Sequence, residues 1–185
     1  MIIGVTGPIA AGTDSFAFYL QKKKFESFSY SDVLREHLHS GGEEITRGGL
    51  QAYANQLRRQ HGTGILSSLL FGKMNHKRDY VIGNIRHPGE VYFFEGLPEF
   101  TLVCIEASAE IRFERAKSRN RERDPKTWEE FLALDAKDYG VGEPLYGQQH
   151  AAVFALARYR IQNEGSLSDL GTAANRLLQE IISID

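Results

Sequence analysis

The stretch Ile2–Asp14, with the sequence IIGVTGPIAAGTD, decides the predicted fold. Ile2–Thr6 is short and β-branched, which favours a buried strand, and Thr13–Lys24 is predicted to be a helix. A glycine-bounded turn between a strand and a helix can curl its backbone N–H groups around an anion, and the helix N-terminus adds partial positive charge. The stretch therefore predicts a phosphate-binding loop. The residues assigned to it are Gly7, Pro8, Ile9, Ala10, Ala11, Gly12, Thr13 and Asp14.

The predicted loop departs from the phosphate-loop pattern G-x-x-x-x-G-K-[ST] at its last two positions. Thr13 stands at the lysine position, and Asp14 stands at the position of the magnesium-binding hydroxyl. Each such change of one unit charge alters the interaction with a phosphate by about 4 kcal/mol at ~4 Å, for an effective dielectric constant of ~20. We therefore expect weakened triphosphate binding unless an arginine or a metal ion compensates. The alternative is a tight turn without a ligand, in which Asp14 caps the helix.

The rest of the chain alternates between strand and helix patterns. Four more strands are predicted, at Phe25–Tyr30, Tyr80–Ile85, Phe100–Ala107 and Tyr159–Gln162. Apolar residues at helical spacing predict helices around positions 50–57 and 65–70. Serine or aspartate caps predict further helices, with Ser31-Asp32 before Val33–His39, Ser108 before Ala109–Lys117, and Ser166 before Leu167–Ile182. This alternation predicts a mostly parallel five-stranded α/β sheet with helices on both faces.

Composition limits the class of protein. The chain has 185 residues, which fits one domain, and its 22 Lys and Arg against 24 Asp and Glu argue against a strongly basic nucleic-acid binder. Cys104 is the only cysteine, so an intrachain disulfide is impossible. No apolar run reaches the roughly 20 residues of a membrane helix. We expect a cytoplasmic protein that binds neither nucleic acid nor membrane, and no histidine pair has the helical spacing of metal ligands.

Five further segments, in chain order, resemble the P-loop nucleoside monophosphate kinase-like family. They are Tyr30–Glu36, Leu57–Gly64, Val81–Val91, Arg115–Phe131 and Ile161–Leu167. Within the family the chain is most similar to dephospho-CoA kinase-like proteins and to the kinase-like module found beside deoxycytidylate deaminases. The resemblance implies a three-layer P-loop NTPase fold over residues 1–185 as a single domain, with a helical lid at about residues 112–131.

The resemblance also implies the roles of several side chains. It places the acceptor's phosphate on Arg35 and Arg86, and ATP is the implied phosphoryl donor. The lid region carries six basic residues against two acidic ones between Arg112 and Arg123, which favours a lid that closes over phosphates; the alternative is a solvated helix. The residues with implied roles are Arg86, Arg115 and Arg119 in catalysis, Arg123 and Asn163 in ATP binding, and Asp32, Arg35, Arg58 and Arg86 in acceptor binding.

Gly83 is a second departure, because the family has a magnesium-serving acid at this position. Besides a structural protein that retains only the fold, two functions therefore stay open at the level of sequence. One is a phosphotransferase that moves a phosphoryl group from ATP to a small nucleotide-like acceptor. The other is a catalytically degenerate module that binds or senses a nucleotide, with a deaminase as a candidate partner. The use of magnesium and the oligomeric state are left open.

Overall fold

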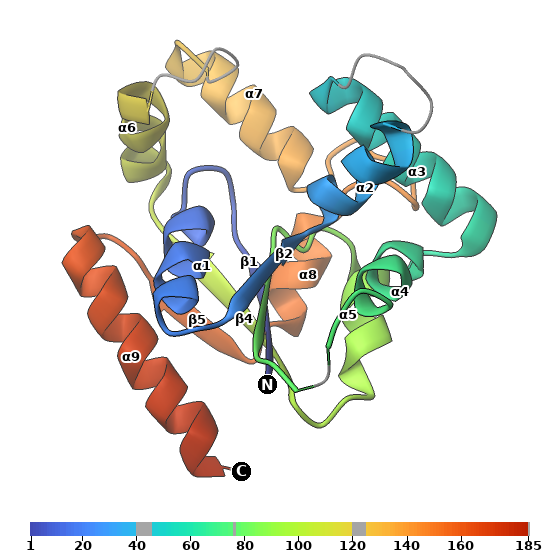
Figure 1. Ribbon diagram of the computed structural model, residues 1–185. Helices are drawn as coiled ribbons and strands as arrows, with labels where there is room; N and C mark the ends of the chain where they lie inside the picture. Colours follow the sequence, from blue (N-terminus) through green and yellow to red (C-terminus); the bar gives the residue numbers. More distant parts are fainter. Residues whose placement is uncertain (40–45, 76, 120–124, 185) are drawn as a thin grey trace.

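A five-stranded parallel sheet forms the centre of the protein (Figure 1). The computed structural model describes residues 1–39, 46–75, 77–119 and 125–184. The strands follow the order β2-β3-β1-β4-β5, and all four neighbouring pairs are parallel. This confirms the sheet predicted from the sequence. The strands are β1 Ile2–Thr6, β2 Glu26–Ser29, β3 Tyr80–Gly83, β4 Phe100–Glu106 and β5 Tyr159–Gln162.

Helices connect the strands and cover both faces of the sheet. They are α1 Thr13–Lys22, α2 Tyr30–His39, α3 Arg47–His61, α4 Ile65–Phe71, α5 Pro88–Glu95, α6 Ala109–Arg119, α7 Trp128–Asp138, α8 His150–Leu156 and α9 Leu167–Ile184. The sequence did not predict α5 and α8, which are short. Figure 1 shows α1 and α9 on one side of the sheet and α4, α5 and α8 on the other, so the molecule has three layers.

The alternation of side chains along β1 divides the core into two parts. Ile2 packs in the cluster with α2, α3, α4, α5 and α8, whereas Ile3 and Val5 pack in the cluster with α1 and α9. Such alternation is the expected result of the two-residue period of a strand. Both faces of the sheet are therefore buried, which is typical of parallel sheets.

The structure corrects one helix cap predicted from the sequence and confirms another. The helix predicted over Val33–His39 begins at Tyr30, and the Ser29 hydroxyl caps it by accepting from the backbone N–H of Asp32 at 3.2 Å. The prediction of Ser31-Asp32 as the cap was wrong because the preceding strand ends one residue before Tyr30. At Ser166 the prediction is confirmed, since its hydroxyl accepts from Asp169 N–H at 3.3 Å.

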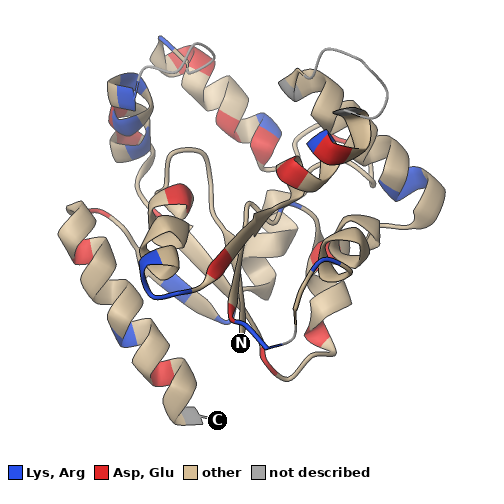
Figure 2. Cartoon of the chain, in the orientation of Figure 1, with Lys and Arg blue, Asp and Glu red and all other residues tan. Residues whose placement is uncertain are grey.

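The predicted lid region is a helical pair in its described part. A bidentate ion pair joins α6 to α7, with Arg112 Nη1 and Nη2 at 2.6 and 2.8 Å from the two carboxylate oxygens of Asp135. Figure 2 shows Lys and Arg on α6 and several Asp and Glu on α7. Within the described ranges, no helix is both long enough and apolar enough to cross a membrane.

Candidate functional site

The loop between β1 and α1 is tightly curled, as the sequence predicted. The backbone N–H of Ala11 donates to Pro8 O at 3.1 Å, and Ala10 and Gly12 have left-handed φ angles of 60° and 107°. A Cβ on Gly12 would lie 2.4 Å from Asn163 Nδ2. Glycine is therefore required at position 12 both by its backbone conformation and by a close neighbour.

Side chains from α6 and from the turn after β5 donate hydrogen bonds to two backbone carbonyl groups of this loop. Asn163 Nδ2 donates to Ala11 O at 2.8 Å. Arg115 Nη1 lies 3.5 Å from the same oxygen, and its Nη2 donates to Gly165 O at 3.0 Å. Arg112 Nη1 reaches Ile9 O at 3.4 Å. These contacts tie the Ile9 and Ala11 carbonyl groups of the loop to α6 and to the turn after β5.

A cleft of about 630 Å³ lies at the carboxyl edge of the sheet. The loop forms one wall, α2 and α3 form the opposite wall, and residues that follow β3 lie between them. Arg119 and Asp138 approach from the lid helices. The lining residues are Gly7, Pro8, Ile9, Ala10, Thr13, Asp14, Tyr30, Ser31, Leu34, Arg35, Leu50, Gln51, Ala54, Arg58, Leu66, Asn84, Arg86, Glu90, Arg119, Asp138, Gln148 and His150.

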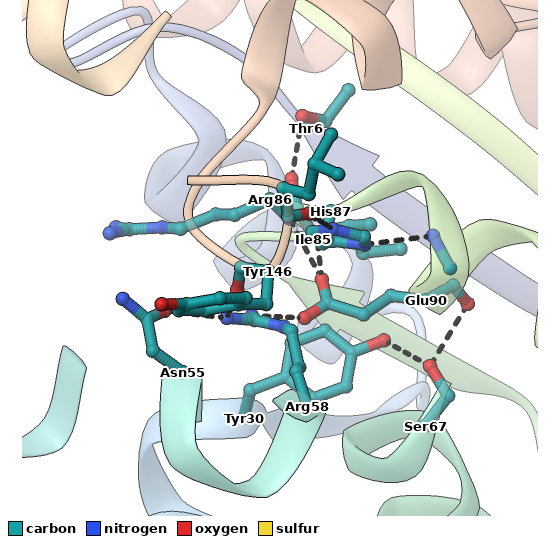
Figure 3. A network of polar contacts seen from close by, with 12 residues as sticks. Thr6, Tyr30, Asn55, Arg58, Ser67, Ile85, Arg86, His87, Glu90 and Tyr146 are labelled. Carbon is teal, nitrogen blue, oxygen red and sulfur yellow. Dashed lines mark hydrogen bonds and ion pairs between the residues drawn. The ribbon is translucent and has the colours of Figure 1, made fainter. Parts of the chain in front are cut away.

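Arg86 is held at the cleft through its backbone and its side chain. Its N–H donates to Glu90 Oε2 at 2.9 Å, and its carbonyl accepts from Gln149 N–H at 2.8 Å. The Gln148 carboxamide links Arg86 to α7, because its oxygen accepts from Arg86 Nη1 at 3.0 Å and its nitrogen donates to Asp138 Oδ1 at 3.1 Å. Figure 3 shows the Arg86 side chain extending away from Glu90. Gln148 therefore orients the guanidinium, while Glu90 and Gln149 hold the backbone of Arg86.

Arg58 and Glu90 form a buried ion pair in the lining of the cleft (Figure 3). Arg58 Nη2 lies 2.5 Å from Glu90 Oε1, and both side chains are at most 5% exposed. The second carboxylate oxygen of Glu90 accepts the N–H groups of Arg86 and His87. Glu90 thus connects a buried cation to the backbone that carries Arg86. The sequence contained Glu90 within the Val81–Val91 resemblance but gave no sign of its burial.

Tyr30 and Ser67 complete this buried network. Tyr30 OH donates to Ser67 Oγ at 2.8 Å, and Ser67 Oγ donates to the backbone carbonyl of Glu90 at 2.9 Å. Burial, followed by the nearby Glu90 carboxylate, raises the pKa of Tyr30 well above its ordinary value. Tyr30 therefore remains a neutral hydroxyl donor at the edge of the cleft.

Arg35 and Asp32 lie on the exposed side of α2. Arg35 Nη1 is 3.1 Å from Asp32 Oδ1. The Arg35 side chain is 48% exposed and the Asp32 side chain 65%. Arg35 lines the cleft, whereas the Asp32 carboxylate also accepts from Ser29 Oγ at 2.6 Å and lies outside the lining. The arrangement places Arg35, and not Asp32, where a ligand would contact it.

The residues predicted for the lid and for ATP binding lie in different parts of the structure. Arg119 lines the cleft, while Arg115 and Asn163 contact the backbone carbonyl of Ala11 in the loop. Arg123 lies outside the described residues. The sequence gave Arg112 no individual role, yet Arg112 joins α6, α7 and the loop. Its ion pair with Asp135 joins residues that are 23 positions apart, and local sequence patterns do not reveal such a contact.

The positions that serve magnesium in the resembled kinases carry a different set of groups here. A Cβ on Gly83 would meet nothing within 4 Å, so the position of the expected acid is open space. Thr13 and Asp14 both line the cleft. Within the described residues, no three His, Cys, Asp or Glu side chains lie close enough together to hold a metal ion. This donor set does not match the magnesium site of those kinases.

Solved kinase structures share this architecture. Shikimate kinase from Acinetobacter baumannii, in complex with shikimate, has a TM-score of 0.59 at 15% identity, with 100% of this chain and 94% of that chain covered. Dephospho-CoA kinase from Campylobacter jejuni has a TM-score of 0.53 at 17% identity, with 97% and 96% covered. At such identities the likeness establishes the fold alone. The chain has the three-layer α/β fold of P-loop kinases.

Sequence relatives define the family. No family model matches the chain. The UPF0200 protein of Thermococcus kodakarensis is 31% identical over 192 residues, covering 99% of both chains. The UPF0200 protein of Hyperthermus butylicus is 31% identical over 183 residues, covering 98% of this chain and 95% of its own. Since these matches extend over almost the whole length, the chain belongs to the UPF0200 family.

Proposed function

We propose that the cleft binds a nucleotide-like phosphate ester and that the protein is a kinase-like phosphotransferase with ATP as the donor. The observation that carries this proposal is that the curled loop and Arg86 line one cleft. Loop N–H groups and arginines are two independent kinds of phosphate-binding group. Their convergence at the carboxyl edge of a parallel sheet is the usual position of a ligand site in an open α/β fold.

The side chains of the cleft suit phosphoryl transfer by positioning and charge neutralisation, which are its main requirements. The loop would face the phosphates of the donor, and Arg35 and Arg86 would hold the phosphate of the acceptor. Arg119 would approach from the lid. Because the residues present do not match a magnesium site, we propose no step through a metal ion.

A second candidate function is nucleotide binding without turnover, as in a sensing module. Thr13, Asp14 and Gly83 favour it, because they remove a cation and a metal ligand and add a negative charge beside the loop. It uses the same cleft and the same arginines. The two candidates therefore differ in turnover and not in the location of the site.

A ligand titration followed by turnover assays tests both candidates. Purified protein is titrated with ATP, GTP and nucleoside monophosphates, with and without magnesium, while its thermal unfolding is followed. A ligand at 100 times its Kd should raise the free energy of unfolding by about 2.7 kcal/mol. Phosphoryl transfer to a bound monophosphate supports the phosphotransferase, and binding without transfer supports the sensing module. If no phosphate compound binds, the proposed function is wrong.

A charge-restoring variant tests the loop itself. Thr13→Lys combined with Asp14→Ser should raise the affinity for ATP at least tenfold, because it adds a cation and removes an anion beside the loop. Thr172→Lys, on the exposed side of α9, adds a cation away from the cleft and serves as the control. Equal ATP affinity in the double variant and the wild type would contradict phosphate binding by the loop.

A further inference from the structure

Asn84 has an unusual backbone conformation at the floor of the cleft. It follows β3 directly, and its φ angle of 59° is left-handed. Two hydrogen bonds fix the next residue against β1: Ile85 N–H donates to Val5 O at 3.1 Å, and Thr6 Oγ1 donates to Ile85 O at 2.8 Å. Asn84 is therefore held beside the end of β1, where the loop begins.

Left-handed conformations cost free energy for residues other than glycine, although asparagine tolerates them through local side-chain hydrogen bonds. Among the described residues, the Asn84 carboxamide takes part in no hydrogen bond. It lines the cleft instead, together with the loop and Arg86. The usual local reason for asparagine in this conformation is thus missing, and unfavourable backbone conformations that persist tend to cluster at functional sites.

The neighbouring position explains why an amide is useful here. Gly83 leaves open space at the place of the acid that would act through a metal ion. A carboxamide carries two N–H donors and no charge, so it can bind a phosphoryl oxygen directly. Asp14 already places a negative charge in the cleft, and a second carboxylate beside the loop would repel an anion.

We propose that Asn84 is a ligand-binding residue whose carboxamide N–H donates to a phosphoryl oxygen held between the loop and Arg86. This inference rests on the proposed function, because it names one further contact for the same phosphate ester. It assigns the left-handed conformation to ligand binding and not to the stability of the fold. Replacing Asn84 should therefore separate affinity from stability.

The test is the variant Asn84→Gly, with Lys24→Gly as the matched control. Lys24 also has a left-handed φ, of 73°, but it precedes β2 and so lies at the opposite edge of the sheet from the cleft. Glycine relieves the backbone cost in both variants, so both should unfold at the same temperature as the wild type or at a higher one. Only Asn84→Gly should lose affinity for the ligand.

Calorimetric titration with inorganic phosphate, adenosine 5′-monophosphate and adenosine measures that affinity. Asn84→Gly should weaken the binding of phosphate and of the monophosphate roughly 10- to 100-fold, since the lost hydrogen bond is to a charged group. Asn84→Asp should weaken them at least as much, because a carboxylate accepts and does not donate. The affinity for adenosine, which has no phosphate, should not change.

The outcomes separate the two proposals. If the wild type binds phosphate compounds and Asn84→Gly binds them equally well, the role of Asn84 is wrong while the proposed function stands. A loss of the same size in Lys24→Gly, or an equal loss of adenosine affinity, would also overturn the role of Asn84. If the wild type binds none of the phosphate compounds, both proposals fail.

Discussion

His87 shows how a single buried residue makes the structure depend on pH. Its Nδ1 accepts from Gly89 N–H at 3.0 Å, and its Nε2 donates to Leu145 O at 2.9 Å. Only the neutral imidazole with its proton on Nε2 makes both bonds. Burial is the largest cause that lowers the pKa of His87 below its ordinary value of 6.5. The neutral ring thereby ties the start of α5 to the segment before α8.

The lowered pKa predicts a loss of stability in acid. Below about pH 6.5 the unfolded chain takes up a proton at His87 before the folded chain does, so the free energy of unfolding falls as the pH falls. Above this pH the contribution is constant. Urea unfolding at about pH 7.5 and about pH 5.5 should show a larger loss for the wild type than for His87→Asn, which keeps an acceptor for Gly89 N–H. Equal losses in the two proteins would contradict this role.

Arg58 shows what residue patterns predict and what they do not. The sequence places Arg58 at the candidate site, and the structure puts it in the lining of the cleft. Its Nη1 donates to Asn55 Oδ1 and to the Tyr146 carbonyl, and its Nη2 donates to Glu90. Its Nε is buried and has no hydrogen-bond partner among the described residues. The pairing with Glu90 spans 32 residues, and sequence spacing alone contains no signal for it.

At the scale of elements, helix α5 is an addition to the sequence prediction, which gave only a strand at Tyr80–Ile85 in this part of the chain. Pro88–Glu95 is helix α5, although its Val, Tyr and Phe residues favour strands. A capping box between His87 and Glu90, with Pro88 in the first turn, starts this helix. Glu90 is buried at the same time, so the tertiary pairing and the cap support each other. Local propensity was overruled by packing.

The pairing of α6 with α7 carries the prediction at this scale. Asp135→Asn leaves the Arg112 guanidinium buried without its counter-charge, which should lower the free energy of unfolding by about 3–5 kcal/mol. Trp128, the only tryptophan, stacks on Phe131 with ring centroids 5.5 Å apart and therefore reports on these helices by fluorescence during urea unfolding. Glu114→Gln removes an exposed charge from α6 and should change the stability by less than about 0.5 kcal/mol. Similar small effects of both substitutions would show that the buried pair contributes little.

For the whole molecule, the sheet was more predictable than the cleft. Each strand has a local signal in its β-branched and aromatic residues, and the right-handed crossover rule restricts how parallel strands are arranged. The cleft instead depends on distant groups that meet at one edge of the sheet, such as Asn84 beside the loop and Gln148 between Arg86 and Asp138. The glycine frame of the loop was predictable because it is contiguous. The contacts of Asn163 and Arg115 with its carbonyl groups were not.

The two core clusters predict that stability and ligand binding separate across the sheet. Leu177 belongs to the cluster with α1 and α9, whereas Leu66 belongs to the opposite cluster and also lines the cleft. Each Leu→Ala substitution should lower the free energy of unfolding by about 2–5 kcal/mol. Leu177→Ala should retain the Kd of the wild type, so ligand at 100 times Kd should still add about 2.7 kcal/mol. Leu66→Ala should lose affinity as well as stability, because its side chain forms part of the wall. Urea unfolding of both variants at increasing ligand concentrations measures the free energy of unfolding and the ligand affinity together. If Leu177→Ala lost as much affinity as Leu66→Ala, the ligand would bind somewhere other than this cleft.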